Sequence, residues 1–334
     1  MRSTIWKKTL ICLGAVLFLE SPAVGTAFAY TVKAENTDAE ADASNIKSIL
    51  LIGQDKREGE SRQRSDSMIL ATLDKDQGTV SLTSFMRDLY VAIPGYSTTR
   101  INAAYAYGGM DLLDETLEEN FGVKIDGNVE VDFEVFQVLV DKVGGIDLEL
   151  TQAEADYICG RDQSVLYPQP LRSDWNLQEG MNHLDGVQAV AYGRLRLMDT
   201  DYARTERQRK VISLAFEKMK KADWATINNI VQTVFPQVAT SIEINDLLKI
   251  GRNITRYHLT ETTGFPSELR EKKMGRKGAC VIPQTLESNV IELHHFLFGD
   301  EEYTPTETVR TISQKIVSDT GVHGTKQAET KALP

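Results

Sequence analysis

Cysteine is scarce in this sequence: the chain has three among 334 residues. Three are too few for a disulfide scaffold or a four-cysteine zinc site. A CxxC pair, an HExxH motif and a Walker-type phosphate loop are also missing, which excludes the usual metalloprotease and NTPase signatures. Cys159 and Cys280 are expected to be separate buried thiols, and a disulfide between them stays an open alternative for an exported protein.

The sequence also lacks a basic excess. It has 37 Lys and Arg against 48 Asp and Glu, a net charge of -11. A general nucleic-acid-binding protein needs a basic surface, so this class is disfavoured. Hydrophobic residues make up 41% of the chain and charged residues 25%. That composition supports a packed core and excludes extended disorder.

The longest apolar run lies at the N-terminus and is short. Arg2, Lys7 and Lys8 precede an apolar run over 10–19, and Ala27-Phe28-Ala29 follows it. This order is typical of a secretory signal. Because the run is shorter than the ~20 residues of a spanning helix, residues 1–29 are predicted to be a signal peptide or a membrane signal-anchor. The acidic, polar residues 30–45 are predicted to be a linker.

Residues 46–300 are predicted to form one α/β domain. Apolar or alternating runs predict strands at 48–52, 68–73, 80–83 and 146–150. Apolar residues at helical spacing predict helices at 108–120, 132–143, 185–192 and from 205 to about 220. Strands mixed with helices throughout favour an α/β sandwich.

The chain from residue 301 to residue 334 is polar. We expect it to be a mostly disordered tail, with about the last fifteen residues unstructured. Val309, Ile312 and Ile316 allow one short helix within it.

Arginines cluster in one segment of this acidic chain. Between residues 194 and 210, three acidic side chains stand among six basic ones: Arg194, Arg196, Arg204, Arg207, Arg209 and Lys210. Arg204, Arg207 and Gln208 lie at i, i+3 and i+4, so a helix would present them on one face. Guanidinium groups that converge at a helix N-terminus fit a pyrophosphate. The alternative is a solvated, ion-paired helix; the arginine density favours the anion site.

Charged residues also flank the first predicted strands. Asp55 follows the strand at 48–52, and Arg64 and Asp66 precede the next strand. Arg87 and Asp88 end the strand after that. Asp55 and Asp66 are candidates to share a hard divalent cation, which prefers carboxylate and phosphate oxygens. Aspartates after strands are commonly turn formers, and the residues alone favour that second interpretation.

Seven short segments stand in a fixed order between about residue 46 and residue 220, roughly half of the chain. They are Gly53-Gln54-Asp55, Arg64-Ser65-Asp66-Ser67-Met68, Ser84-Phe85-Met86-Arg87-Asp88, Ile93-Pro94-Gly95, Arg100-Ile101-Asn102-Ala103-Ala104-Tyr105-Ala106-Tyr107-Gly108-Gly109, Ala191-Tyr192-Gly193-Arg194-Leu195-Arg196 and Asp201-Tyr202-Ala203-Arg204-Thr205-Glu206-Arg207-Gln208-Arg209. Together they resemble the LytR-CpsA-Psr family of cell-envelope proteins. As an ordered set the segments are highly specific.

The resemblance implies a central mixed β-sheet with helices on both faces, an α-β-α sandwich that encloses an apolar tunnel. It implies an extracytoplasmic phosphotransferase that moves a glycopolymer from a polyprenyl-pyrophosphate carrier to peptidoglycan. The implied partners are the lipid-linked glycopolymer, the peptidoglycan acceptor and the cytoplasmic membrane, with no nucleic acid. The N-terminal segment would attach the exported protein to that membrane.

By position, the resemblance also assigns roles to individual residues. Asp55 and Asp66 are the implied Mg²⁺ ligands, and Arg87 is the implied catalytic arginine. The implied pyrophosphate contacts are Arg64, Arg194, Arg196, Arg204 and Gln208, with Asp201 and Arg207 in support. The acceptor hydroxyl must lose a proton, for which Asp55, Asp66 or a metal-bound hydroxide are candidates.

Some apolar residues have the spacing of a tunnel lining and equally that of a core helix. The packed core is the favoured interpretation. These residues are Leu112, Leu117, Phe133, Phe136, Leu139 and Val140.

Two other functions stay open. A non-enzymatic protein that binds polyprenyl pyrophosphate or wall polymer would need the arginines but not Asp55, Asp66 and Arg87, whose presence weighs against it. A transcriptional attenuator or regulator would act inside the cell. Without residues 1–29, which carry three basic side chains and one acidic one, the net charge changes from -11 to -13. That charge and the export signal weigh against a regulator.

Overall fold

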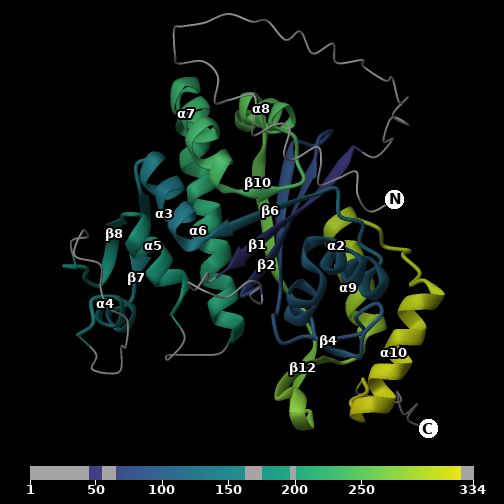
Figure 1. Cartoon of the computed structure of the whole chain (residues 1–334). Helices are drawn as coiled ribbons and strands as arrows, with labels where there is room; N and C mark the ends of the chain where they lie inside the picture. The colour runs from purple at the N-terminus through teal and green to yellow at the C-terminus, as the bar shows by residue number, and fades with distance from the viewer. Residues whose placement is uncertain (1–44, 55–64, 162–174, 196–200, 325–334) are drawn as a thin grey trace, which may run out of the picture. The chain divides into compact units, whose positions relative to one another are not determined.

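A six-stranded mixed sheet runs through the protein in the computed structural model, which describes residues 45–54, 65–161, 175–195 and 201–324 (Figure 1). Its strand order is β10-β3-β2-β1-β6-β9. The strands are β1 (Ile46–Gln54), β2 (Ser67–Asp74), β3 (Thr79–Phe85), β6 (Gly127–Asp132), β9 (Ala239–Thr240) and β10 (His258–Phe265). β2 is antiparallel to β1 and β3, whereas β1 pairs with β6, and β3 with β10, in parallel. The first three predicted strands are confirmed as β1, β2 and β3.

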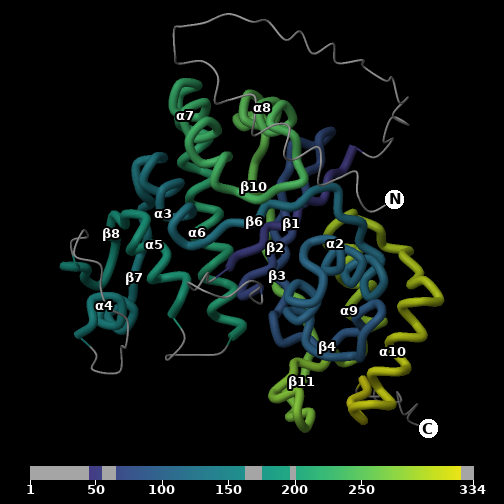
Figure 2. The backbone as a smooth tube through the Cα atoms, in the orientation of Figure 1, coloured from purple at the N-terminus to yellow at the C-terminus, as the bar shows by residue number. Residues whose placement is uncertain are grey.

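Helices cover both faces of this sheet (Figures 1 and 2). One face carries α3 (Phe133–Lys142), α5 (Gly186–Gly193), α6 (Asp201–Lys221), α7 (Trp224–Val234) and α8 (Ile244–Arg252). The other carries α2 (Asn102–Phe121), α9 (Leu286–Phe298) and α10 (Glu307–Thr320). The predicted α-β-α sandwich is therefore confirmed.

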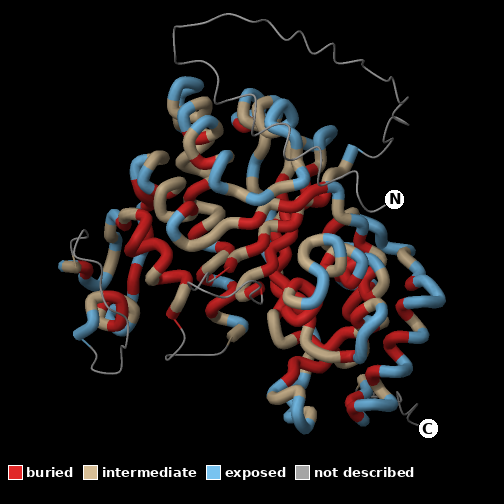
Figure 3. Tube along the Cα trace, viewed as in Figure 1, coloured by how far each residue is buried: buried red, intermediate tan, exposed pale blue. Residues whose placement is uncertain are grey.

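The sheet is apolar on both sides because its strands alternate two sets of apolar residues. In β1, Leu50 and Ile52 pack into the core beneath α2 and α9, whereas Ile49 and Leu51 point to the opposite face. Figure 3 shows these central strands as the buried middle of the molecule. A sheet that is buried on both faces requires a helical layer on each.

In the described part of the chain, three two-stranded antiparallel sheets and one short helix lie outside the central sheet. The sheets are β4 (Tyr90–Val91) with β5 (Thr99–Arg100), β7 (Ile146–Leu150) with β8 (Gly180–Leu184), and β11 (Leu269–Lys273) with β12 (Ala279–Pro283). The short helix is α4 (Gln152–Ile158), and 3-10 turns cover Phe235–Gln237, Ile254–Arg256 and Gly275–Lys277. The strand predicted at 146–150 is confirmed as β7.

Helix α2 starts earlier than the predicted helix at 108–120. It begins at Asn102 and is interrupted at Gly109, whose φ of 73° and ψ of -153° are not helical. Apolar periodicity begins only with Leu112, so the pattern detected the second half alone. Helix α6 likewise begins at Asp201 instead of Thr205.

The short helix that Val309, Ile312 and Ile316 allowed is confirmed as α10, but the expectation of a mostly disordered tail is wrong for the residues that this helix covers. Val309, Ile312 and Ile316 lie on one side of α10 and are at most 8% exposed, in the core that α2 and α9 share. The polar composition was misleading because a helix at the edge of a domain buries only one apolar stripe. Residues 325–334 lie outside the described residues.

The predicted signal and linker at 1–29 and 30–45 lie, except for Asn45, outside the described residues. Within the described ranges, none of the helices has the length and apolarity that crossing a bilayer requires. Cys159 and Cys280 are both free thiols; Cys280 is buried, as expected, and Cys159 is partly buried.

Replacing Ile316 with alanine tests the structural role of α10. The side chain is 1% exposed, so its truncation should lower the free energy of unfolding by about 2–5 kcal/mol. Lys315→Ala removes an exposed i,i+4 pair with Asp319 and should change stability by less than about 0.5 kcal/mol. Urea unfolding of both variants gives the comparison; equal stabilities would contradict the packing of α10 against the core.

Candidate active site

Three chain segments that carry predicted site residues meet at one edge of the sheet. Because β2 is antiparallel to β1 and β3, the end of β1, the start of β2 and the end of β3 lie together. Asp66 precedes β2, and its backbone N–H donates to the carbonyl of Gly53 at 3.0 Å. Arg87 follows β3, and α6 begins beside it at Asp201.

Arg87 lies among three carboxylates. Its Nη1 donates to Oδ1 of Asp66 at 2.8 Å, and its Nε lies 3.5 Å from Oδ2 of Asp88 and 4.0 Å from Oδ1 of Asp201. Burial lowers the pKa of Arg87, but Asp201, Asp88 and Asp66 together outweigh it, so the pKa is raised above its usual value. The guanidinium therefore keeps its charge at a half-buried position.

The first turns of α6 supply a second guanidinium and an amide. Arg204 is 1% exposed, and its Nη2 lies 2.7 Å from Oδ1 of Asp201. The Nε2 of Gln208 donates to the Gly193 carbonyl at 3.4 Å. Oδ2 of Asp201 and Oε1 of Gln208 are buried and accept no hydrogen bond from the described residues. These two oxygens are unsatisfied acceptors next to the arginines.

An apolar cavity of about 450 Å³ reaches this group of residues. Arg194 and Gln208 are among its few polar lining residues, together with Ser67 at the start of β2. Arg194 lies at the C-terminal end of α5, with its guanidinium carbon 4.4 Å from the centre of the Phe133 ring. The rest of the lining is almost entirely aliphatic or aromatic.

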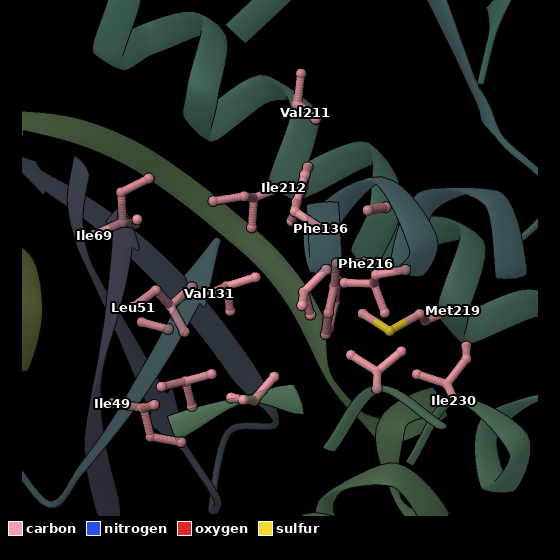
Figure 4. A pocket seen from close by; sticks show the side chains of 18 of the residues that line it. Ile49, Leu51, Ile69, Val131, Phe136, Val211, Ile212, Phe216, Met219 and Ile230 are labelled. Atoms are coloured by element: carbon pink, nitrogen blue, oxygen red, sulfur yellow. The ribbon is translucent and has the colours of Figure 1, made fainter. Parts of the chain in front are cut away.

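The cavity lies between the sheet and the helices of one face. Figure 4 shows side chains of β1, β2 and β6 on one side and side chains of α3, α6 and α7 on the other. Among them are Leu51 and Val131 from the sheet, Phe136 from α3 and Phe216 from α6. Such a space fits a long apolar chain better than a compact polar ligand.

The six residues whose apolar spacing allowed two interpretations lie in different environments in the structure. Phe133, Phe136 and Leu139 line the cavity. Leu117 and Val140 are fully buried in packed cores, and Leu112 packs against the core of Leu117. Periodicity alone did not separate these environments, because each buries one apolar face of a helix.

Arg207 does not share the environment of Arg204 and Gln208, although the spacing had predicted one common face. Its Nε lies 3.2 Å from Oε1 of Glu154, and its Nη1 is 3.5 Å from the Leu195 carbonyl. A helix turns by about 100° per residue, so positions i+3 and i+4 lie on opposite sides of position i. Arg207 thereby joins α6 to α4, and its supporting role in the site stays a prediction.

Three predicted site residues, Asp55, Arg64 and Arg196, lie outside the described residues, and their roles stay predictions. The structure brings the other members of the set to the sheet edge and the adjoining end of the cavity. These are Asp66, Arg87, Arg194, Asp201, Arg204 and Gln208.

The predicted site residues did not include Asp88. Asp88 accepts from Nη1 of Arg100 at 3.0 Å while it faces Arg87, so it joins two guanidinium groups. Asp88 stood inside a quoted segment, but sequence spacing carries no information on contacts between segments.

Residues 18–276 match the model of the LytR_cpsA_psr family. A curated relative, the polyisoprenyl-teichoic acid–peptidoglycan teichoic acid transferase TagT of Bacillus subtilis, is 31% identical over 293 residues, which cover 79% of this chain and 87% of TagT. The B. subtilis transferase TagV, which bears the same description, is 34% identical over 211 residues. That match covers 61% of this chain and about half, 51%, of TagV.

A solved structure of B. subtilis TagV has the same fold. It superposes with a TM-score of 0.61 at 28% sequence identity. The superposition covers 78% of this chain and 98% of the TagV chain in that structure. The sheet and its two helical layers therefore belong to one shared architecture.

Two substitutions on α6 separate an anion ligand from a structural arginine. Arg204→Lys keeps the charge but loses the planar fork, so the affinity for inorganic pyrophosphate should fall about tenfold with little change in melting temperature. Arg207→Ala should instead lower the free energy of unfolding by about 1–3 kcal/mol, because Glu154 loses its partner. The affinity of Arg207→Ala for pyrophosphate should stay within about twofold of wild type.

Calorimetric titration with pyrophosphate and thermal unfolding measure the two effects on each variant. The reverse pattern, with weaker binding only in Arg207→Ala, would show that the anion binds on the α4 side of α6.

Proposed function

The chain belongs to the LytR-CpsA-Psr family, and from that premise we propose that it transfers a glycopolymer of the teichoic-acid type from a polyprenyl-pyrophosphate carrier to peptidoglycan. The proposal rests on one observation: an apolar environment and a polar, positively charged one meet at the same place. An apolar cavity of about 450 Å³ reaches Arg194 and Gln208, next to the start of α6. A molecule with a long apolar tail and a pyrophosphate head would place its tail in the cavity and its head beside these polar residues. TagT and TagV, named as transferases of polyisoprenyl-linked teichoic acid, support it.

In the proposed reaction the acceptor hydroxyl attacks the phosphorus that carries the glycopolymer. A new P–O bond to the acceptor forms, and the bond to the lipid phosphate oxygen breaks. Phosphoryl transfer depends mainly on positioning and on stabilising charge at the phosphate oxygens. Arg87 and Arg204 supply fixed positive charge for those oxygens. The leaving polyprenyl phosphate is a stable anion, so it needs no strong general acid.

The acceptor hydroxyl gives up one proton in this step. A general base must lie within hydrogen-bonding reach of the hydroxyl, directly or through one water. Asp66 is a carboxylate at the sheet edge, and Arg87 holds it in place through the hydrogen bond to Oδ1. Asp66 and Asp55 are the proposed candidates for that base.

We propose that Asp66 and Asp55 also hold Mg²⁺. Among the described residues no three acidic, histidine or cysteine side chains form a metal site by themselves, so the ligand set depends on Asp55 and on substrate oxygens. The donor chemistry fits, because Mg²⁺ is usually held by one or two carboxylates together with substrate phosphates. The buried Oδ2 of Asp201, which accepts no hydrogen bond from the described residues, adds a hard oxygen nearby. When bound, the ion would neutralise charge on the phosphates.

Asp66→Asn tests this assignment and separates an enzyme from a binding protein. The change keeps the size of the side chain but removes one negative charge. Transfer to a peptidoglycan fragment should fall by about a hundredfold or more, while binding of a prenyl lipid in the cavity and the melting temperature should persist. Asp74→Asn is the matched control, because Asp74 is a turn former that accepts from the backbone of Asp76 and Gln77.

Two outcomes would contradict the assignment. Wild-type transfer rates in Asp66→Asn would show that Asp66 is only a turn former. If wild type transfers at an undiminished rate in a chelator, the metal has no role in the reaction and the arginines act without it. A protein that binds the lipid pyrophosphate but transfers nothing under any condition would be the non-enzymatic alternative.

We further propose that the domain works outside the cytoplasm, attached to the membrane by residues 1–29. Peptidoglycan, the acceptor in the names of TagT and TagV, lies on that side of the membrane. A reporter that folds only outside the cytoplasm, fused after residue 334, should be active, and a cytoplasmic reporter at the same position should be silent. Fusions that lack residues 1–29 are the control and should reverse the pattern. The reversed pattern in the full chain would contradict export.

A further inference from the structure

Two tyrosines form an exposed stacked pair near the candidate active site. Tyr96 is 53% exposed and Tyr107 is 44% exposed. Their ring centroids lie 4.7 Å apart with 22° between the ring planes. Large aromatic side chains are usually buried, and an exposed cluster of them commonly marks a binding surface.

Both tyrosines stand on rigid supports. Tyr96 closes a turn in which its N–H donates to the Ile93 carbonyl at 2.9 Å, with Pro94 and Gly95 in the middle. The φ of Gly95 is 73°, which suits the third position of a type II turn. Ile93 anchors this turn in the core. Tyr96 is therefore held in place by its own turn.

Tyr107 is fixed from within its own helix. Two residues earlier, the Tyr105 hydroxyl donates to the buried carboxylate of Glu130 on β6. The helix breaks two residues later at Gly109. Tyr107 is thus the last large side chain of the first half of α2, and its backbone is set by a buried contact.

The pair is linked to the candidate active site by short, hydrogen-bonded segments. Tyr96 lies in the β4–β5 hairpin, whose last residue is Arg100. Arg100 donates to Asp88, the neighbour of Arg87. The first residue of α2, Asn102, donates its N–H to the Arg87 carbonyl at 3.2 Å. Tyr107 follows five residues later, about 7–8 Å along the helix axis.

We propose that Tyr96 and Tyr107 form a platform for the sugar rings of the acceptor, the glycan strand of peptidoglycan. The proposal rests on the proposed transfer function and adds the acceptor site to it. A tyrosine offers a flat apolar face for the C–H side of a pyranose ring, and its hydroxyl supplies a hydrogen bond at the edge. Rigid tyrosines provide such contacts with little loss of entropy.

The direction of attack favours the acceptor over the donor as the occupant. In phosphoryl transfer the entering and leaving oxygens lie roughly in line, on opposite sides of the phosphorus. The cavity for the leaving lipid lies on the α6 side of the sheet. The tyrosines lie on the segments of the opposite layer, with α2. An acceptor that enters from the α2 side therefore faces the lipid phosphate across Arg87.

Charge also favours a glycan strand over a polymer that carries a phosphate in every repeat. The second half of α2 carries five acidic residues and no basic one: Asp111, Asp114, Glu115, Glu118 and Glu119. Burial and the neighbouring Glu115 and Glu118 raise the pKa of Glu119. A poly(alditol phosphate) such as teichoic acid would be repelled along this helix more strongly than a glycan strand, whose charge is limited to the lactyl carboxylate of each muramic acid.

The test compares Tyr96→Ala/Tyr107→Ala with Trp224→Ala in the full chain. Trp224 is also an exposed aromatic residue, at 43%, but it lies at the start of α7. The first readout is NMR titration with a peptidoglycan glycan fragment stripped of its peptides, which needs no activity. The second is the KM for that acceptor and for the lipid-linked donor, together with hydrolysis of the donor by water. Melting temperatures confirm folding.

In the double variant we expect glycan affinity to fall and the acceptor KM to rise by about tenfold. The donor KM and donor hydrolysis should stay within about twofold of wild type, as should every value for Trp224→Ala. An unchanged glycan affinity would overturn the platform, and so would a rise confined to the donor KM. If wild type neither transfers nor hydrolyses the donor, the proposed function fails, and the titration still decides whether the pair binds a glycan.

Discussion

The site depends on one constraint, which is that charged arginine side chains are buried beside an apolar cavity. A guanidinium that is 1% exposed, as in Arg204, is tolerated only when a carboxylate compensates the lost hydration. Asp201 does so for Arg204, and together with Asp66 and Asp88 it surrounds Arg87. These carboxylates therefore make the burial of Arg204 and Arg87 possible. An entering pyrophosphate would add negative charge to a group of side chains whose charges already nearly balance, and a divalent cation would offset that added charge.

Much of the sandwich was predictable from local patterns. Strands such as β1 carry apolar residues on both sides, and α3 has a regular apolar stripe, so both were detected within one or two residues of their ends. The first half of α2 was missed because it consists mainly of alanines and tyrosines with little apolar contrast. The helix α10 was underestimated because three buried side chains in a polar segment have meaning only when a core exists to receive them.

The candidate site, too, was only partly predictable from the sequence. Composition and spacing were enough to select Arg204 and Gln208, and the family resemblance added Asp66 and Arg87. The sequence did not show which charged side chains pair with each other. The pair between Arg207 and Glu154 spans 53 positions, and the link between Asp88 and Arg100 crosses a hairpin. For the same reason no pattern separated Phe136, which lines the cavity, from Val140, which lies in a packed core one turn later.

The sheet has a further consequence for the direction of the chemistry. Its two faces are both apolar, but in the part of the chain that the structure describes the cavity of about 450 Å³ lies on the α6 face, while the α2 face is filled by stacked aromatic rings such as Phe85 and Phe121. A long apolar ligand would therefore be accommodated on the α6 face. Arg87 follows β3 and lies between the two helical layers. Its side chain faces Asp201 at the start of α6, and its carbonyl accepts from the N–H of Asn102 at the start of α2. In the proposed reaction the sheet edge is thus the boundary at which a lipid-borne phosphate from the α6 layer would meet an acceptor that approaches along the α2 layer.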